Sequence, residues 1–257
     1  MRTTVRNRMA GVVFLVLCGC ATQEPAFIPL SKDLSQRINS SNAVIVASQK
    51  EIVADVDKSQ VAAVMGGGLI PALIDVAIEK SRASSAEELI RPIRDALVEF
   101  DMGKDLREAL GTRLDSIAWL HLVKWDTTYD NRADHIPTQL AANKEDVLVL
   151  ITPGYALSSD FQSLRVESEV KVIPRAASLR VVGGAKGNNE KVEPLYKVKV
   201  SHLAPLAVGG TDKEGAAKEW SKDGGVRIKE YMKQGVSSIA DKIVESLTHP
   251  ERAPLEK

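Results

Sequence analysis

The chain has few residues of the kinds that form disulfides, metal sites and aromatic surfaces. Its 257 residues include two cysteines and four histidines, and only 4% of them are aromatic. Both cysteines, Cys18 and Cys20, lie near the N-terminus. The rest of the chain therefore has no thiol for a disulfide, a cysteine–metal site or a cysteine nucleophile.

Neither sign of charge dominates. Lys and Arg together number 34, as do Asp and Glu. Removing Arg2, Arg6 and Arg8, which precede the first apolar segment, leaves 31 basic against 34 acidic residues, a formal charge of about −3. This balance excludes the basic surface typical of nucleic-acid-binding proteins. No second long apolar segment follows that could span a membrane.

The N-terminus has the pattern of an export signal. Its three arginines, with no acidic residue among them, precede an apolar segment at 9–18. A spanning helix needs about 20 apolar residues, so this shorter segment is typical of a signal peptide that is removed from the mature protein.

The signal ends in Leu17-Cys18-Gly19-Cys20, which resembles the lipobox of bacterial lipoproteins. The resemblance implies cleavage after Gly19, a diacylglyceryl group on the sulfur of Cys20 and an acyl chain such as palmitate on its amine. Several chains anchor firmly, because each buried methylene contributes about 0.8 kcal/mol. Ala21, rather than Asp, resembles the signal for sorting to the outer membrane. A secreted protein with incidental cysteines is the alternative.

The remaining chain is predicted to form one domain. Residues 1–19 are the signal peptide, 20–38 the lipidated cysteine and tether, 39–249 the domain, and 250–257 a C-terminal tail. The first part of the tether, 21–30, reaches at most about 35 Å when extended, which keeps the domain near the membrane.

Hydrophobic periodicity predicts an α/β (α+β) domain, with a mixed sheet of about five strands packed by helices. Strands are expected at 42–48 with a continuation to 56, and at 119–125, 146–158, 163–174 and 194–203. Helices are expected within 61–82, after the three glycines at 66–68, from Ser85 towards Phe100 with an interruption at Pro92, and at 104–117. Glycines and asparagines at 183–189 predict a turn. The chain ends in a long amphipathic helix, in which Ile228, Ile239 and Leu247 share one face.

Two motifs suggest ligand binding, but each has a simpler structural explanation. Three glycines at 66–68 precede a helix, where backbone amides attract phosphate, yet Pro71 replaces the third glycine of a dinucleotide fingerprint. The loop at 126–137 contains Asp126, Asp130, Asp134 and His135 but lacks the spacing of a calcium loop. We interpret the glycines as a tight turn into the helix and the loop as a solvated loop. No cofactor and no metal is therefore predicted.

Catalytic motifs are not recognised either. No GxSxG sequence occurs, and Ser158 and Ser159 have no histidine nearby in the sequence. The histidines are scattered, at His121, His135, His202 and His249. A hydrolase stays an alternative only because a triad requires proximity in space.

The alternating strand at 163–173 is long enough to be a membrane β-strand of a pore-forming oligomer. Phe161 and Tyr196 are isolated, however, and do not form an aromatic girdle. Alternation is common in soluble antiparallel sheets, which favours a sheet with one face in water.

The order of elements resembles the α/β domain of several periplasmic proteins: the N-terminal domain of the Tol-Pal translocation protein, the curli secretion channel lipoprotein and the lipoprotein activators of peptidoglycan synthases. The segments GGGLIPALID, RPIRDALVEFD and EWSKDGGVRIKEYMKQG also resemble uncharacterised Gram-negative outer-membrane lipoproteins. No catalytic residue is transferred by these likenesses, and the membrane hairpins of the curli channel have no counterpart.

The sequence therefore predicts a non-enzymatic lipoprotein on the periplasmic face of the outer membrane. Its expected partners are membrane lipid, through Cys20, and an envelope protein, with no nucleic acid. An oligomeric secretion or pore component, formed by several copies of the chain, is the alternative, and a lipid-tethered hydrolase is a further one.

Replacement of Cys20 by serine tests the anchor. Serine cannot carry the thioether-linked lipid, so Cys20→Ser should move the protein from the membrane fraction to the soluble fraction. Cell fractionation and blotting measure the change. Cys18→Ser is the matched control and should leave the protein on the membrane; a Cys20→Ser protein that stays there would contradict the anchor.

Overall fold

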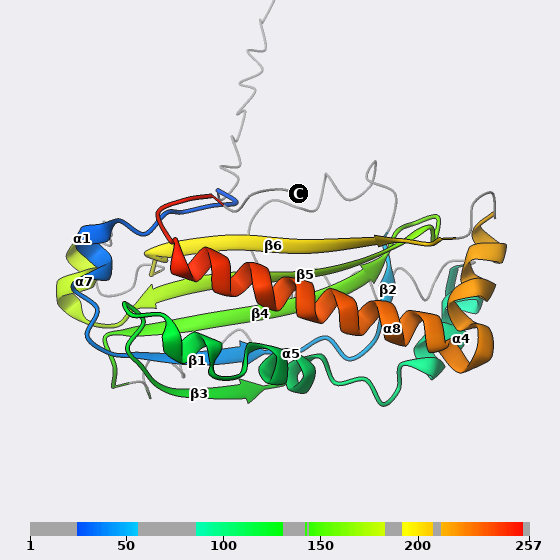
Figure 1. Cartoon of the computed structure of the whole chain (residues 1–257), viewed down its shortest axis with the longest axis horizontal. Coiled ribbons are helices and arrows are strands. Elements are labelled where there is room, and N and C mark those ends of the chain that lie inside the picture. Colours follow the sequence, from blue (N-terminus) through cyan, green and yellow to red (C-terminus); the bar gives the residue numbers. More distant parts are fainter. Residues whose placement is uncertain are drawn as a thin grey trace, which may run out of the picture.

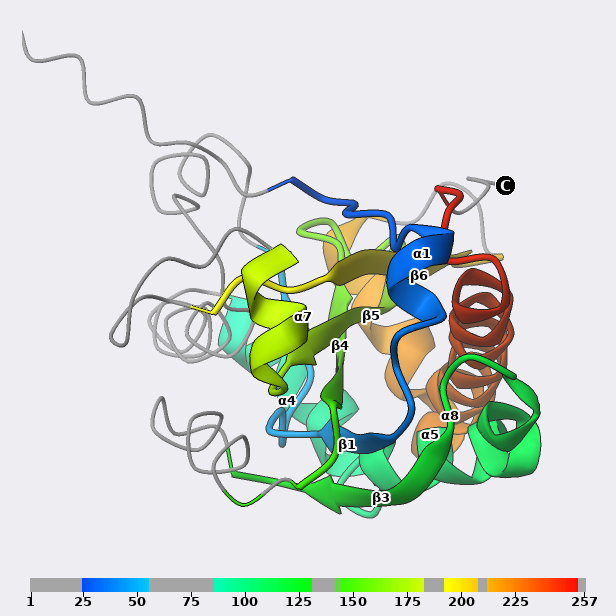
Figure 2. The same ribbon diagram turned by 90° about the vertical axis from the view of Figure 1, so that its left-hand side faces the viewer.

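A computed structural model describes residues 25–55, 86–130, 142, 144–182, 192–207 and 212–253. Within these ranges, six strands form one sheet, flanked by helices (Figures 1 and 2). The strands are β1 Ser41–Val46, β2 Val53–Ala54, β3 Leu122–Thr128, β4 Val147–Leu157, β5 Ser163–Pro174 and β6 Tyr196–Pro205. The helices are α1 Lys32–Ser35, α4 Ala86–Ala96, α5 Met102–Leu110, α7 Ala177–Val182 and α8 Lys213–Thr248, with a 3-10 turn, η1, at Gly111–Ser116.

The sheet is mixed. Its order is β3-β1-β4-β5-β6, and β2 pairs with the far end of β4. β1 is parallel to β3 and β4, whereas β5 is antiparallel to β4 and β6. This arrangement confirms the predicted α/β fold with its long C-terminal helix, and the sheet has six strands where about five were expected.

The two longest strands follow directly from their sequence patterns. β4 is an apolar run that is buried on both faces, as expected for a central strand. β5 alternates, and its apolar residues Leu164, Val166, Val170 and Val172 are fully buried. Period-two alternation places these side chains on one face of the sheet, where they form part of the main core.

Helix α8 covers that face and crosses β5 and β6 (Figure 1). Ile228, Ile239 and Ile243 point into the core and are fully buried. Gly235 brings the helix close to the sheet, since a Cβ at this position would lie 2.5 Å from Cγ2 of Val166. A smaller apolar cluster, formed by Val44, Val46, Leu148, Leu150 and Ile173, is separate from the main core.

Gln49 completes the sheet between β1 and β2. β1 pairs with β4 only as far as Ile151, and β2 pairs with it from Ala156. In the gap, the Gln49 amide donates to the carbonyl of Tyr155 (2.6 Å) and accepts from its N–H (2.9 Å), as a neighbouring strand would. Pro153 lies two residues earlier, so its missing N–H falls in the same gap, which explains a proline in a central strand.

The N-terminal segment packs onto the domain from Phe27 onward. Ile28 and Lys197 exchange two backbone hydrogen bonds (2.8 and 3.0 Å), which adds one antiparallel bridge to the edge of β6. Leu30 and Ile38 are buried in the main core. Much of the stretch predicted as a tether, 20–38, therefore contributes to the packed structure.

Several boundaries differ from the predicted ones for local reasons. α4 continues through Pro92 as far as Ala96. The helix expected to end at 117 stops at Leu110, where Gly111 has φ 44° and η1 begins. β3 begins three residues later than expected, after His121 with its positive φ of 42°.

The predicted continuation of the first strand to 56 is reduced in the structure to the two residues of β2. The segment 61–82, with its three glycines and the helix expected after them, lies outside the described residues, as does the turn expected at 183–189.

Replacement of Gln49 tests its role in the sheet. Gln49→Ala leaves the buried N–H and C=O of Tyr155 without their partner, so the free energy of unfolding should fall by about 1–3 kcal/mol. Urea unfolding of the non-lipidated Cys20→Ser protein measures it. Gln36→Ala, at an exposed side chain, is the control and should change stability by less than about 0.5 kcal/mol. Equal effects would show that the Gln49 amide does not complete the ladder.

Candidate functional site

Helix α8 is broken by the sequence Lys222-Asp223-Gly224-Gly225. Lys222 is extended (φ −56°, ψ 144°), and the next three residues have left-handed φ values of 53°, 68° and 75°. Glycine adopts this region readily, and Asp is among the other residues that tolerate it best. The kink therefore follows from the local sequence, and it divides α8 into 213–221 and 226–248.

The kink packs closely against α4. A Cβ on Gly225 would lie 2.3 Å from Cβ of Ala96, whereas one on Gly224 would meet nothing within 4 Å. Gly225 is thus required both for its backbone conformation and for the close approach of the two helices.

Trp220 fixes the part of α8 that precedes the kink. Its side chain is fully buried, and its indole N–H donates to the carbonyl of Phe161 (2.7 Å), at the turn between β4 and β5. The ring of Tyr231, after the kink, packs edge-on against Trp220 with centroids 5.4 Å apart. The two segments of α8 therefore contact each other across the bend.

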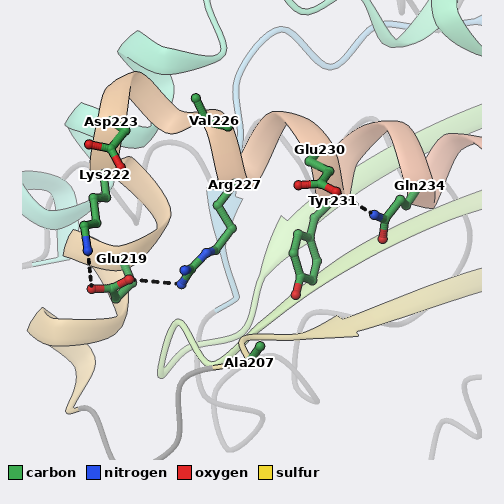
Figure 3. Close-up of a pocket in the computed structure, with 9 residues that line it drawn as sticks. All are labelled: Ala207, Glu219, Lys222, Asp223, Val226, Arg227, Glu230, Tyr231 and Gln234. Atoms are coloured by element: carbon green, nitrogen blue, oxygen red, sulfur yellow. Dashed lines mark hydrogen bonds and ion pairs between the residues drawn. The ribbon is translucent and has the colours of Figure 1, made fainter.

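Glu219 also spans the kink. One carboxylate oxygen lies 3.0 Å from Nη1 of Arg227, and the other lies 3.8 Å from Nζ of Lys222 (Figure 3). The side chains of Glu219 and Arg227 are 25% and 34% exposed, so water screens this pair in part. Both oxygens of Glu219 nevertheless face a cation.

These residues border a hollow of about 430 Å³ beside the kink (Figure 3). It is lined by Ala207, Glu219, Lys222, Asp223, Val226, Arg227, Glu230, Tyr231 and Gln234. All of them except Ala207 belong to α8; Ala207 follows the end of β6. The volume is within the range of small-molecule sites, about 300–1,000 Å³.

The chemistry of the hollow is mixed rather than strongly charged. Two cations and three carboxylates line it, and Glu219 lies within ion-pair distance of both cations. Gln234 donates to Glu230 at 3.3 Å, and Tyr231 adds a hydroxyl to a partly apolar wall. Val226 is 61% exposed. Such a lining suits a polar ligand or peptide segment that carries donors, acceptors and an apolar group.

Of the loop considered for metal binding, the structure describes Asp126 and Asp130. Asp126 pairs with Lys124 (2.6 Å) on β3, whereas Asp134 and His135 lie outside the described ranges, as do Gly19 and Cys20. Among the described residues, no three His, Cys, Asp or Glu side chains are arranged to hold a metal ion. No helix described combines the length and apolar composition needed to cross a membrane.

Ser158 belongs to the turn between β4 and β5. Its hydroxyl donates to Asp160 (2.5 Å) and accepts from the N–H of Ser163 (3.0 Å). The bond from Ser158 holds the pKa of Asp160 below its usual range. His202 lies on β6, where burial, together with the charge of Lys242, lowers its pKa. The described contacts of Ser158 are those of a turn.

The polar face of β5 is less exposed than its alternation suggests. Glu167 and Glu169 are each only 14% exposed. Glu167 pairs with Arg165 and Lys199, and Glu169 pairs with Lys171 and Lys197. The polar face of β5 and β6 therefore carries a ladder of ion pairs, in which Arg165 and Lys199 are 38% and 46% exposed.

Comparisons with known proteins leave the family open. No family model and no curated protein matches the chain. Among solved structures, a PelC dodecamer from Paraburkholderia phytofirmans aligns over 86% of this chain and 91% of that chain, at 8% identity and a TM-score of 0.26. A point variant of that protein aligns at 9% identity with the same TM-score, over 85% and 91%. Likeness at this level carries no argument about function.

Paired glycine substitutions test the kink. Gly224→Ala and Gly225→Ala both place a Cβ at positive φ, at a cost of about 1–2 kcal/mol. Gly225→Ala also clashes with Ala96, so it should cost a further ~1–3 kcal/mol in urea unfolding of the Cys20→Ser protein. Combining it with Ala96→Gly should recover part of the loss in a double-mutant cycle. Equal losses for the two glycines would contradict the close packing.

Proposed function

We propose that the protein is a lipid-anchored binding or assembly module, held by Cys20 on the periplasmic face of the outer membrane. The single observation that carries this proposal is Leu17-Cys18-Gly19-Cys20, placed directly after an export signal. The domain that follows has a hydrophobic core of its own. In this proposal the lipid attaches the protein to the membrane, and the domain contacts a partner.

The kink hollow is the candidate contact surface. It combines exposed Val226 with Arg227, Glu230 and Tyr231, a mixture typical of sites that recognise a polar segment of another molecule. Asp223 and the glycines beside it hold a left-handed conformation that costs free energy in a non-glycine residue. Such local cost is common at functional surfaces, and this supports a binding role for the kink.

Self-assembly is a second candidate, because β3 and β6 are the two edges of the described sheet. Edge strands present backbone groups to which another chain can pair. On its outer side β6 has one bridge, at Lys197, and the carbonyl of Ser201 accepts from Lys242 (2.5 Å). Among the described residues, no strand pairs with this side of β6.

Photo-crosslinking from the hollow tests the proposal. A benzophenone amino acid at Val226 should yield a recurrent crosslinked envelope protein in intact cells. The same group at Val98, which is 81% exposed and does not line the hollow, is the matched control. A product of twice the chain mass would favour self-assembly. Crosslinks to lipid alone, or the same products from both positions, would contradict a partner-binding hollow.

A further inference from the structure

The start of the described chain is held at one end of the domain. Ile28 forms the bridge to Lys197 at the beginning of β6, and the ring of Phe27 packs edge-on against Tyr196 with centroids 6.2 Å apart. The N–H of Leu30 donates to the carbonyl of Pro250 (3.0 Å), just beyond α8. The chain that leads to Cys20 therefore departs beside the C-terminus of α8.

Two side-chain hydrogen bonds hold the C-terminal part of α8 at the same end of the domain. Burial raises the pKa of Tyr196 to about 12, and its hydroxyl donates to the carbonyl of Ser246 (3.0 Å). The indole N–H of Trp119 donates to the carbonyl of Leu247 (2.6 Å). The point at which the tether joins the domain is thus part of the rigid structure.

The stretch of chain between Cys20 and Phe27 is short. Seven Cα–Cα steps separate Cys20 from Phe27, and at the extended limit they span about 25 Å. The opposite end of the domain is farther away than this. β6 extends about 26 Å from Lys197 to Pro205, and α8 extends about 33 Å from Val226 to Thr248.

β6 and the segment of α8 after the kink run along the same axis in opposite chain directions. In Figure 1, the start of β6 and the C-terminus of α8 lie at one end of the molecule, and the kink lies at the other. If the kink end faced the membrane, the tether would have to run back along the whole domain, and about 25 Å is too short for that path.

The tether end is polar. Lys32 and Arg37 on and after α1, and Arg252 after α8, are exposed beside Asp33 and Glu251. Exposed cations and carboxylates of this kind suit contact with hydrated lipid headgroups rather than insertion into the acyl chains.

We propose that the end of the domain formed by α1, the start of β6 and the C-terminus of α8 lies against the lipid headgroups of the anchoring leaflet. The kink hollow then faces away from the membrane, towards molecules in the compartment beyond. This inference rests on the proposed lipid anchor at Cys20.

Site-specific labels measure the orientation. Processing removes Cys18 and acylation occupies the sulfur of Cys20, so an introduced cysteine is the one reactive thiol of the mature chain. Lipidated Glu251→Cys and Val226→Cys proteins are labelled with an environment-sensitive fluorophore. They are then reconstituted in phosphatidylethanolamine–phosphatidylglycerol vesicles that contain a headgroup spin-labelled lipid as the quencher.

The label at position 251 should be quenched several-fold more strongly than the label at position 226. Insertion of about 12 Gly and Ser residues between Gln23 and Glu24 adds up to about 40 Å of reach and should reduce the difference. Equal quenching without the insertion, or stronger quenching at position 226, would overturn the orientation.

Vesicle flotation separates this result from the fate of the anchor. If the labelled proteins float with the vesicles and Cys20→Ser does not, the anchor holds and the quenching tests the orientation alone. If Cys20→Ser floats equally well, the proposed function itself fails, and the orientation fails with it.

Discussion

Burial of one side of α8 against β5 and β6 is the interaction on which the domain depends. Gly235 lets the helix approach Val166, and the isoleucines on either side of it fill the space between helix and sheet. Each such side chain contributes about 1.5–3 kcal/mol when fully buried. α4 and α5 in turn pack against α8, so the whole layer of helices is positioned by this contact.

The kink allows the two segments of α8 to pack against different parts of the domain. The segment after it must lie along the sheet, whereas the segment before it places Trp220 under the β4–β5 turn. A straight helix cannot satisfy both. Three consecutive residues with positive φ solve the problem locally, and the hollow beside them is a direct result of the bend.

Patterns carried by neighbouring residues predict the fold well. β4 and β5 are found almost at their expected bounds, because a continuous apolar run and a strict alternation are properties of the segment itself. The fold class follows from the order of such segments. In contrast, the burial of Leu30 and Ile38 depends on contacts with distant parts of the chain, and no local pattern distinguishes them from tether residues.

The candidate site could be predicted only in part. Asp223-Gly224-Gly225 is a recognisable helix-breaking signal, but the apolar stripe that begins at Ile228 predicts a helix without assigning a role to the break. The hollow needs Ala207 from the end of β6, and its place beside α8 is a property of the three-dimensional fold. Gln49 was missed for a similar reason, since a side chain that replaces a strand has no sequence pattern.

The bridge between Ile28 and Lys197 also has a mechanical consequence. Tension on the N-terminal end of the chain is delivered first to an edge strand and, through Leu30 and Pro250, to the end of the longest helix. A single antiparallel bridge resists such a load with two hydrogen bonds, whereas the buried side chain of Leu30 behind it must be extracted from the core. A pulling force would therefore break the bridge at Ile28 first, and further extension would require Leu30 to leave the core.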